Sequence, residues 1–235
     1  MNWPDVSQPD VGVVIVAAGA GVRAGPGEPK QFRPIQGVPL LLRTVRPFTS
    51  HPGVGMVVVA LPAGFAARPP DWLGPLVSER LLLVAGGATR ADSVRAGLGA
   101  LPAWVGVVLV HDGVRPFVSR NTIDAVIRTA RTGVGAVAAV PLSDTLKEVA
   151  VPPRIARTVR RDGLWRAQTP QGFPRHMLER AYAALGPGDA APTDDAALCE
   201  RAGLPVEVVP DQASNLKVTT ADDFRIAEAM ARELG

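Results

Sequence analysis

Runs of consecutive apolar residues, rich in valine, recur along this chain at the length of β-strands. They are continuous rather than alternating, which is typical of strands buried on both faces of a parallel sheet. The predicted strands lie near residues 12–17, 56–61, 81–85, 105–110 and 135–140. Helix-length segments separate several of them, at 39–50, 90–101 and 121–133. This alternation predicts an α/β fold with an open, doubly wound, mostly parallel sheet, and ligands at the carboxyl ends of its strands.

The pattern changes at residue 141. Residues 141–165, PLSDTLKEVAVPPRIARTVRRDGLW, alternate short extended pieces with charges around a Pro-Pro turn and lack a helical period. We expect them to form an arm or hairpin that projects from the domain. Because a single chain gains little from such an excursion, a swapped or clasping homodimer is the hypothesis that follows.

The remainder of the chain returns to regular structure. Helices are expected near 174–185 and 193–202, a strand at 205–209, and a closing helix with Thr220 as its N-cap. Three further helix ends are predicted from capping residues: Asn121 and Thr193 as N-caps, and Gly133 as a C-terminal stop. With no internal repeat or long linker, residues 1–235 are expected to form one domain that includes the arm.

Composition excludes several classes of protein. The net charge is only +3 and aromatic residues are 5% of the chain, so neither a nucleic-acid surface nor stacking on single strands is indicated. No apolar run is long enough for a membrane span. The N-terminus lacks the pattern of a secretory signal, so we expect a cytoplasmic protein. Cys199 is the single cysteine, and a buried structural thiol is the expectation for it.

The first predicted strand leads into VAAGAGVRAGPGEPKQF, residues 16–32. Its small residues can offer unobstructed backbone N–H groups to a phosphate; they are Ala17, Ala18, Gly19 and Gly21. Arg23 and Lys30 follow, which suits the charge that builds on a phosphate during phosphoryl or nucleotidyl transfer. The segment matches neither the P-loop nor the dinucleotide fingerprint. An ordinary βα turn with a solvated arginine and lysine is the alternative.

Two more strand ends carry candidate residues. In GGATRADSV, residues 86–94, Gly87 and Ala88 permit close contact with a base or ribose, and the Ser93 hydroxyl is a candidate ligand contact. The alternative is a glycine turn that starts a helix, with Asp92 complementing the helix dipole.

In VHDGVRPF, residues 110–117, Asp112 is placed to hold a divalent ion that bridges phosphates, and Arg115 to bind another anion. A turn in which Asp112 and Arg115 pair with each other is equally open. We expect His111 to be a packed side chain and not a metal ligand, because no second histidine lies at a useful spacing.

Four polar or cationic residues remain in segments expected to be irregular: Thr145, Arg161, Thr169 and Lys217. The segment TDDAAL, residues 193–198, has the pattern of a helix start, with Thr193 as the cap and Asp194 and Asp195 in the first turn.

Taken together, AAGAGVR…PKQF, GGATRADSV, HDGVRPF, SDTLK, RRDGLWRAQTPQGF, TDDAAL and NLKVT resemble the family of 2-C-methyl-D-erythritol 4-phosphate cytidylyltransferases. The resemblance covers about residues 11–232, and PKQF and LWRAQTPQGF are its most specific motifs. It implies a homodimeric, Rossmann-like enzyme of the non-mevalonate isoprenoid pathway. Such an enzyme transfers CMP from CTP to methylerythritol phosphate with Mg²⁺, releasing pyrophosphate.

The resemblance also implies roles for the matching positions. Arg23 and Lys30 would stabilise the transition state, and Arg161 and Lys217 would position the attacking phosphate. CTP would contact Ala17, Ala18, Gly19, Gly87, Ala88 and Ser93, with Asp112 near Mg²⁺ and the acceptor. The acceptor site would consist of Asp112, Arg115, Thr145, Arg161, Thr169 and Lys217, with Thr145 and Arg161 reaching the neighbouring subunit.

The chain departs from the family pattern at three places. Ala24 stands where methionine is usual, Gly113-Val114 replaces the common Ala-Ala pair, and Ala88 stands where some members have an acidic residue.

Three alternatives stay open at this point. A pentitol phosphate such as ribitol 5-phosphate could be the acceptor. A dinucleotide-dependent oxidoreductase is disfavoured because residues 57–64 lack an acidic residue. A non-catalytic nucleotide-binding module is disfavoured as well, because binding alone does not require the two cations Arg23 and Lys30.

Overall fold

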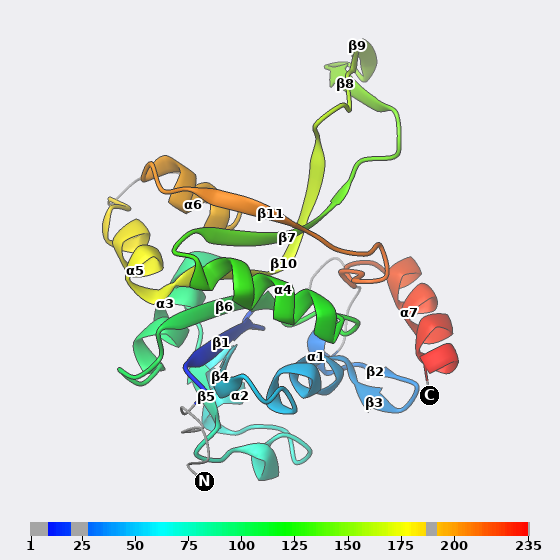
Figure 1. The fold of residues 1–235 in the computed structure, drawn as a ribbon. Coiled ribbons are helices and arrows are strands. Elements are labelled where there is room, and N and C mark those ends of the chain that lie inside the picture. The colour runs from blue at the N-terminus through cyan, green and yellow to red at the C-terminus, as the bar shows by residue number, and fades with distance from the viewer. Residues whose placement is uncertain (1–8, 20–27, 187–191, 235) are drawn as a thin grey trace, which may run out of the picture.

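A seven-stranded sheet forms the centre of the computed structural model, which describes residues 9–19, 28–186 and 192–234 (Figure 1). Its strands, in spatial order, are β11 (Val206–Pro210), β7 (Gly135–Pro141), β10 (Trp165–Pro174), β6 (Val107–Asp112), β1 (Val11–Val16), β4 (Val54–Leu61) and β5 (Leu81–Ala85). All pairings are parallel except those of β10, which is antiparallel to both of its neighbours. The mostly parallel α/β fold predicted from the sequence is therefore confirmed.

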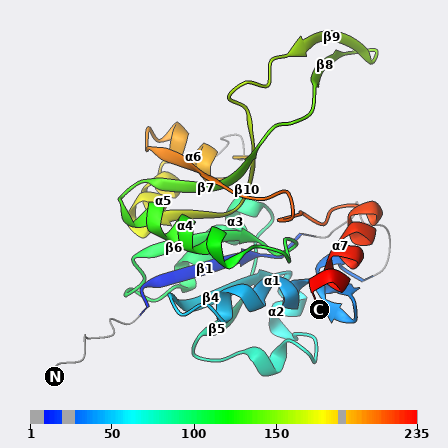
Figure 2. The same cartoon turned by 45° about the vertical axis from the view of Figure 1, so that its right-hand side comes forward.

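Helices cover both faces of this sheet (Figures 1 and 2). One face packs against α1 (Leu40–Thr49), α2 (Ala63–Ala67) and α4 (Arg120–Arg131), and the other against α3 (Arg90–Ala100), α5 (Arg175–Ala183) and α6 (Asp195–Arg201). Successive strand residues alternate between the two cores: Val13 and Ile15 of β1 belong to the first, and Val14 to the second. The continuous valine runs follow from this two-sided burial.

Two smaller structures complete the fold. A β2–β3 hairpin (Pro34–Ile35 and Val38–Pro39) turns through Gln36 and Gly37, both with positive φ. Beside it lies α7 (Ala221–Leu234) (Figure 2). Short 3-10 turns occur at Lys30–Phe32 and Gly74–Leu76.

Helix ends agree with the sequence only in part. Thr220 caps α7 as predicted, because its hydroxyl accepts from the Asp223 N–H at 3.2 Å. The prediction for α4 was wrong: Ser119, not Asn121, is the N-cap and accepts from the Thr122 N–H at 3.0 Å. Similarly, Asp194 and not Thr193 caps α6. In both cases several residues able to cap a helix stand close together, and the sequence does not say which one has the extended backbone.

The strand β10 was missed, because QTPQGF was expected to be irregular. Proline and glycine are poor residues for a central strand, and this one contains Pro170 and Gly172. The pairing of β10 with β7 is irregular between Ala167 and Gln171, so the proline falls where a ladder hydrogen bond is not needed. Thr169 therefore lies in a sheet strand and not in a loop.

The predicted arm is a two-stranded hairpin, β8 (Leu146–Ala150) and β9 (Arg154–Val159), between β7 and β10. Figures 1 and 2 show it projecting far from the sheet. Apolar side chains lie exposed along it, with Val149 57% and Ile155 65% accessible. A role for the arm in dimerisation stays a prediction.

Candidate active site

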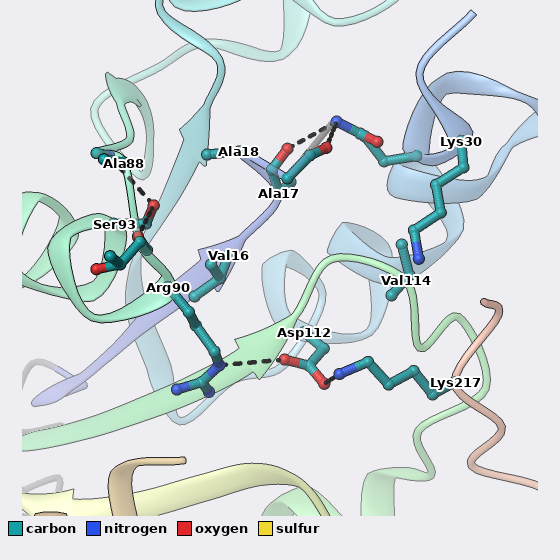
Figure 3. Close-up of a pocket in the computed structure, with 14 residues that line it drawn as sticks. Val16, Ala17, Ala18, Lys30, Ala88, Arg90, Ser93, Asp112, Val114 and Lys217 are labelled. Atoms are coloured by element: carbon teal, nitrogen blue, oxygen red, sulfur yellow. Dashed lines mark hydrogen bonds and ion pairs between the residues drawn. The ribbon is translucent and has the colours of Figure 1, made fainter. Parts of the chain in front are cut away.

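The carboxyl ends of β1, β5 and β6 meet at one edge of the sheet, where they surround a cavity of about 290 Å³ (Figure 3). Strand β1 has β4 on one side and β6 on the other, which makes this edge the switch point at which doubly wound sheets bind ligands. Most of the predicted site residues that the structure describes line the cavity: Ala17, Ala18, Gly19, Lys30, Gly87, Ala88, Ser93, Asp112 and Lys217. Gly21, Arg23 and Ala24 lie outside the described residues.

Side-chain hydrogen bonds from Gln31 fix the loop after β1. The sequence suggested no role for this residue. Its buried side-chain amide donates to the carbonyl oxygens of Ala17 at 2.8 Å and of Gly19 at 3.3 Å. Its neighbour Lys30 donates from Nζ to the Val218 carbonyl at 3.2 Å. The PKQF motif thus fixes the small-residue loop and places a cation beside it.

The second loop, after β5, is shaped by its own hydrogen bonds. The buried Ser93 hydroxyl accepts from the Gly87 N–H at 3.2 Å and donates to the Thr89 carbonyl at 3.0 Å. Thr89 and Asp92 form a capping box at the start of α3, so Asp92 does more than complement the helix dipole. Ser93 lines the cavity, but its hydroxyl already serves to hold the loop.

Asp112 is the last residue of β6 and pairs in register with Val16, so it lies where the first loop begins. Three cations approach its carboxylate: Lys217 Nζ at 2.8 Å, Arg115 Nε at 3.5 Å and Arg90 Nε at 3.6 Å. Burial alone would raise the pKa of Asp112, but Lys217, Arg90 and Arg115 together hold that pKa far below its usual value. The carboxylate is therefore ionised near neutral pH.

A second hollow of about 160 Å³ adjoins the first and shares Arg90, Asp112 and Lys217 with it. Arg115 and Thr169 line this hollow. The hollow therefore brings the predicted acceptor residues of the domain together and places them next to the cavity lined by the predicted CTP contacts.

The walls of the second hollow are fixed by hydrogen bonds of residues that the sequence did not single out, chiefly Asn215 and Gln168. Asn215 accepts at its backbone carbonyl from Arg115 at 2.8 Å and from Gln168 at 3.0 Å. The Asn215 amide in turn donates to the Thr169 carbonyl at 2.7 Å. These bonds hold the segment that carries Lys217 against β10.

His111 is a packed side chain buried beneath the site, as predicted. Its Nε2–H donates to the Arg115 carbonyl at 3.1 Å, and its Nδ1 accepts from the Thr169 hydroxyl at 3.0 Å. The same hydroxyl accepts from the Asp112 N–H at 3.0 Å. Burial lowers the pKa of His111 to about 4, so the ring is neutral near pH 7.

Among the described residues, no three or more His, Cys, Asp or Glu side chains cluster as a metal site. Cys199 is buried and unbonded to sulfur, as expected, and burial raises the pKa of its thiol to about 12. None of the helices in the described part of the chain has the length and apolar character needed to cross a bilayer.

The arm residues Thr145 and Arg161 are not brought to either hollow of their own chain. Both are exposed, and the Arg161 guanidinium donates to the Ser143 carbonyl. The arm points away from the domain that carries the other site residues (Figure 1).

Arg90 is the functional residue that sequence reasoning missed most clearly. It lines both hollows and bridges Asp112 and Asp195, with its Nη1 2.7 Å from an Asp195 oxygen. Burial on its own lowers the pKa of Arg90, but the two carboxylates raise it above its ordinary value. The only feature of the sequence that pointed to Arg90 as a site residue was its place within the segment GGATRADSV.

Such a site, with a loop of small residues, clustered cations and one ionised carboxylate at the switch point, defines an α/β protein that binds polyanionic ligands. Comparison with known proteins defines it further. The model of the 2-C-methyl-D-erythritol 4-phosphate cytidylyltransferase family matches residues 11–233. The chain belongs to this family of nucleotidyltransferases, as its motifs indicated.

Individual relatives agree over nearly the whole chain. The 2-C-methyl-D-erythritol 4-phosphate cytidylyltransferase of Frankia casuarinae is 43% identical over 229 residues, covering 96% of this chain and 82% of that protein. That of Syntrophus aciditrophicus is 39% identical and covers 96% and 97%. The crystal structure of the enzyme of this name from Thermus thermophilus superposes with a TM-score of 0.80 at 36% identity, covering 95% and 99%.

Proposed function

We propose that this chain transfers the cytidylyl group of CTP to 2-C-methyl-D-erythritol 4-phosphate and releases pyrophosphate. Family membership supports the proposal, and one observation carries it: Asp112 and its three cations stand at the wall between two adjoining hollows, beside the small-residue loop and Lys30. One hollow has the size and lining for a nucleotide, and the other gathers cations for a phosphate. The arrangement brings two polyanions together, which is the main task in this chemistry.

In the proposed reaction, an oxygen of the acceptor phosphate attacks the α-phosphorus of CTP. A new P–O bond forms, the bond to the bridging oxygen of the β-phosphate breaks, and pyrophosphate leaves with its electron pair. The attacking oxygen is already anionic, so the chain need not supply a covalent nucleophile. Lys30 and Arg23 would stabilise the extra charge on the α-phosphate.

The remaining residues would bind and orient the substrates. Backbone groups of the two loops would hold CTP, at Ala17, Ala18, Gly19, Gly87 and Ala88, with Ser93 keeping the second loop in shape. Arg115, Thr169 and Lys217 would hold the acceptor phosphate in the second hollow.

Mg²⁺ fits this site. It is usually held by one or two carboxylates together with substrate phosphates, and Asp112 is the one carboxylate among the described residues lining the nucleotide-side cavity. Asp112 would supply the protein oxygen, and the ion would neutralise charge on the triphosphate. Arg90, Arg115 and Lys217 remain close enough to share the phosphate charge.

We also propose a homodimer with exchanged arms, in which Thr145 and Arg161 from one chain complete the acceptor site of the other. The exposed apolar side chains of the hairpin support this, because a partner would cover them. A cytoplasmic location is proposed as well, since the lone cysteine is a free thiol and the substrates are phosphorylated metabolites.

The test is pyrophosphate release with each nucleoside triphosphate and each acceptor, with and without Mg²⁺. Release with CTP and methylerythritol phosphate, and not with ATP, GTP or UTP, is the expected result. Release only with ribitol 5-phosphate would keep the chemistry and change the acceptor. No release with any pair would leave a nucleotide-binding module as the function.

A further inference from the structure

Arg90 pairs with the carboxylate oxygen of Asp112 that Lys217 and Arg115 do not contact. Lys217 Nζ and Arg115 Nε both lie against Oδ2 of Asp112, at 2.8 and 3.5 Å, whereas Arg90 Nε lies 3.6 Å from Oδ1. Figure 3 shows Arg90 and Lys217 approaching the carboxylate from opposite sides. Two cations on one oxygen do not fix the rotation of a carboxylate, but a third on the other oxygen does.

Arg90 is itself anchored away from the cavities. Its Nη1 donates to Asp195, which is completely buried, at 2.7 Å. The other oxygen of Asp195 accepts from the Tyr182 hydroxyl at 2.6 Å. The Asp195 N–H donates to the side-chain oxygen of Gln171 on β10 at 3.1 Å. Helices α5 and α6 and strand β10 thus determine where the guanidinium can lie.

We infer that Arg90 is a positioning residue that sets the orientation of the Asp112 carboxylate, with Asp195 and Tyr182 fixing Arg90 in place. The inference rests on the proposed function, because it assumes that Asp112 serves the reaction. It assigns a catalytic consequence to Tyr182, whose side chain lies outside both hollows.

The first test removes the arginine without leaving a buried carboxylate unpaired, in the double variant Arg90→Gln/Asp195→Asn. Its kcat should fall on the order of 100-fold, because a misplacement of about 1 Å has an effect of that size. Its KM for CTP should stay within about 3-fold of wild type, since the two loops and Lys30, which are proposed to hold CTP, remain. Arg90→Lys keeps a positive charge but not the planar guanidinium. Its kcat should therefore lie between that of the double variant and that of wild type. The exposed Arg180→Gln on α5 is the control and should leave kcat unchanged.

The second test separates positioning from a general structural effect. Tyr182→Phe should lower kcat several-fold in the wild-type background, and should have no further effect on kcat in Arg90→Gln/Asp195→Asn, because it acts through the residues already removed. A merely structural role would lower the melting temperature in both backgrounds and leave kcat of the folded enzyme unchanged. That pattern, or a normal kcat in the double variant, would overturn the inference.

A crystal structure of Arg90→Gln/Asp195→Asn keeps the inference separate from the proposed function. A rotated or displaced Asp112 carboxylate supports the inference, and an unchanged one contradicts it. This readout does not require turnover, so it decides the matter even if the wild-type protein transfers cytidylyl groups to neither acceptor.

Discussion

Lys217 and Asp112 form an ion pair of 2.8 Å that joins the segment before α7 to the end of β6. The Lys217 side chain is 43% exposed and that of Asp112 only 10%, so the lysine reaches over the carboxylate from the solvent side. The pair closes the wall shared by the two hollows. If a substrate phosphate enters the second hollow as proposed, it would meet Lys217 before Asp112.

Replacing Lys217 should affect the acceptor more than the nucleotide. Because a hydrogen bond to a charged group contributes about 1.5 to 3 kcal/mol, Lys217→Ala should raise KM for the acceptor by roughly 10- to 100-fold. KM for CTP should change little. Steady-state kinetics with each substrate varied in turn measures both, and Lys217→Arg, which keeps the charge, should lie between wild type and Lys217→Ala. An equal loss for both substrates would contradict the assignment.

Lys30→Ala and Arg23→Ala should each lower kcat by roughly two to three powers of ten, which corresponds to about 3 to 4 kcal/mol of lost transition-state stabilisation. Lys30 belongs to a short turn whose Phe32 is buried against Phe65, with ring centroids 4.7 Å apart, so the turn should survive the change. Rapid-quench measurement of the chemical step, with melting temperature as the control, tests this. Turnover near the wild-type rate in either variant would contradict the proposed role of that residue in stabilising the transition state.

The sequence predicted this site well where residues follow a strand and poorly where they come from elsewhere. Ala17, Gly87 and Asp112 stand at the ends of apolar strands or within two residues of them, and the topology of a doubly wound sheet brings such positions together. Arg90 and Asp195 are the first residues of two different helices, α3 and α6, and only the tertiary fold brings the two side chains within 2.7 Å of each other. No spacing rule connects them.

Strand β10 likewise could not be predicted from residue types or spacing. Pro170 would argue against a central strand, and only the irregular pairing with β7 explains why it is tolerated. The antiparallel strand that carries Thr169 to the acceptor hollow is therefore a feature of the tertiary structure.

His111 should make the stability of the fold depend on pH. Its folded-state pKa of about 4 lies below the ordinary value of 6.5, so between these values the unfolded chain binds a proton that the folded chain does not. Stability from this group is complete above pH 6.5 and decreases as the pH falls toward 4. Between pH 7 and 4.5 the loss should be about 2 kcal/mol. Urea unfolding of wild type and His111→Asn at both pH values measures it. The variant should lose correspondingly less, and identical pH slopes would show that His111 does not titrate in this way.

Gly113, which stands where the family commonly has alanine, lies very close to the loop after β1 in this chain. A Cβ at this position would lie 2.7 Å from the Ala17 Cβ and 3.0 Å from the Val16 carbonyl oxygen. With the rest of this chain unchanged, Gly113→Ala should therefore force the loop after β1 to shift and lower stability by about 1 to 3 kcal/mol. Gly99→Ala is the matched control, because a Cβ there meets nothing within 4 Å and alanine favours the α3 helix. Equal stability of the two variants would mean that the loop has room to adjust.

The arm residue Arg161 offers a test of the proposed dimer. If Arg161 acts on the neighbouring chain, a heterodimer of Arg161→Ala and Lys30→Ala contains one site with both defects and one with neither. Random exchange of the two inactive variants should then restore about one quarter of the wild-type sites. The heterodimer itself, isolated after co-expression with two different affinity tags, should show about one half of the wild-type activity. Pyrophosphate release measures both samples. Isolated heterodimers without activity would exclude a site shared in this way, and a monomer in light scattering at micromolar concentration would exclude the dimer itself. Activity in the heterodimer would assign the exposed arm its role, because within one chain Arg161 lines neither hollow.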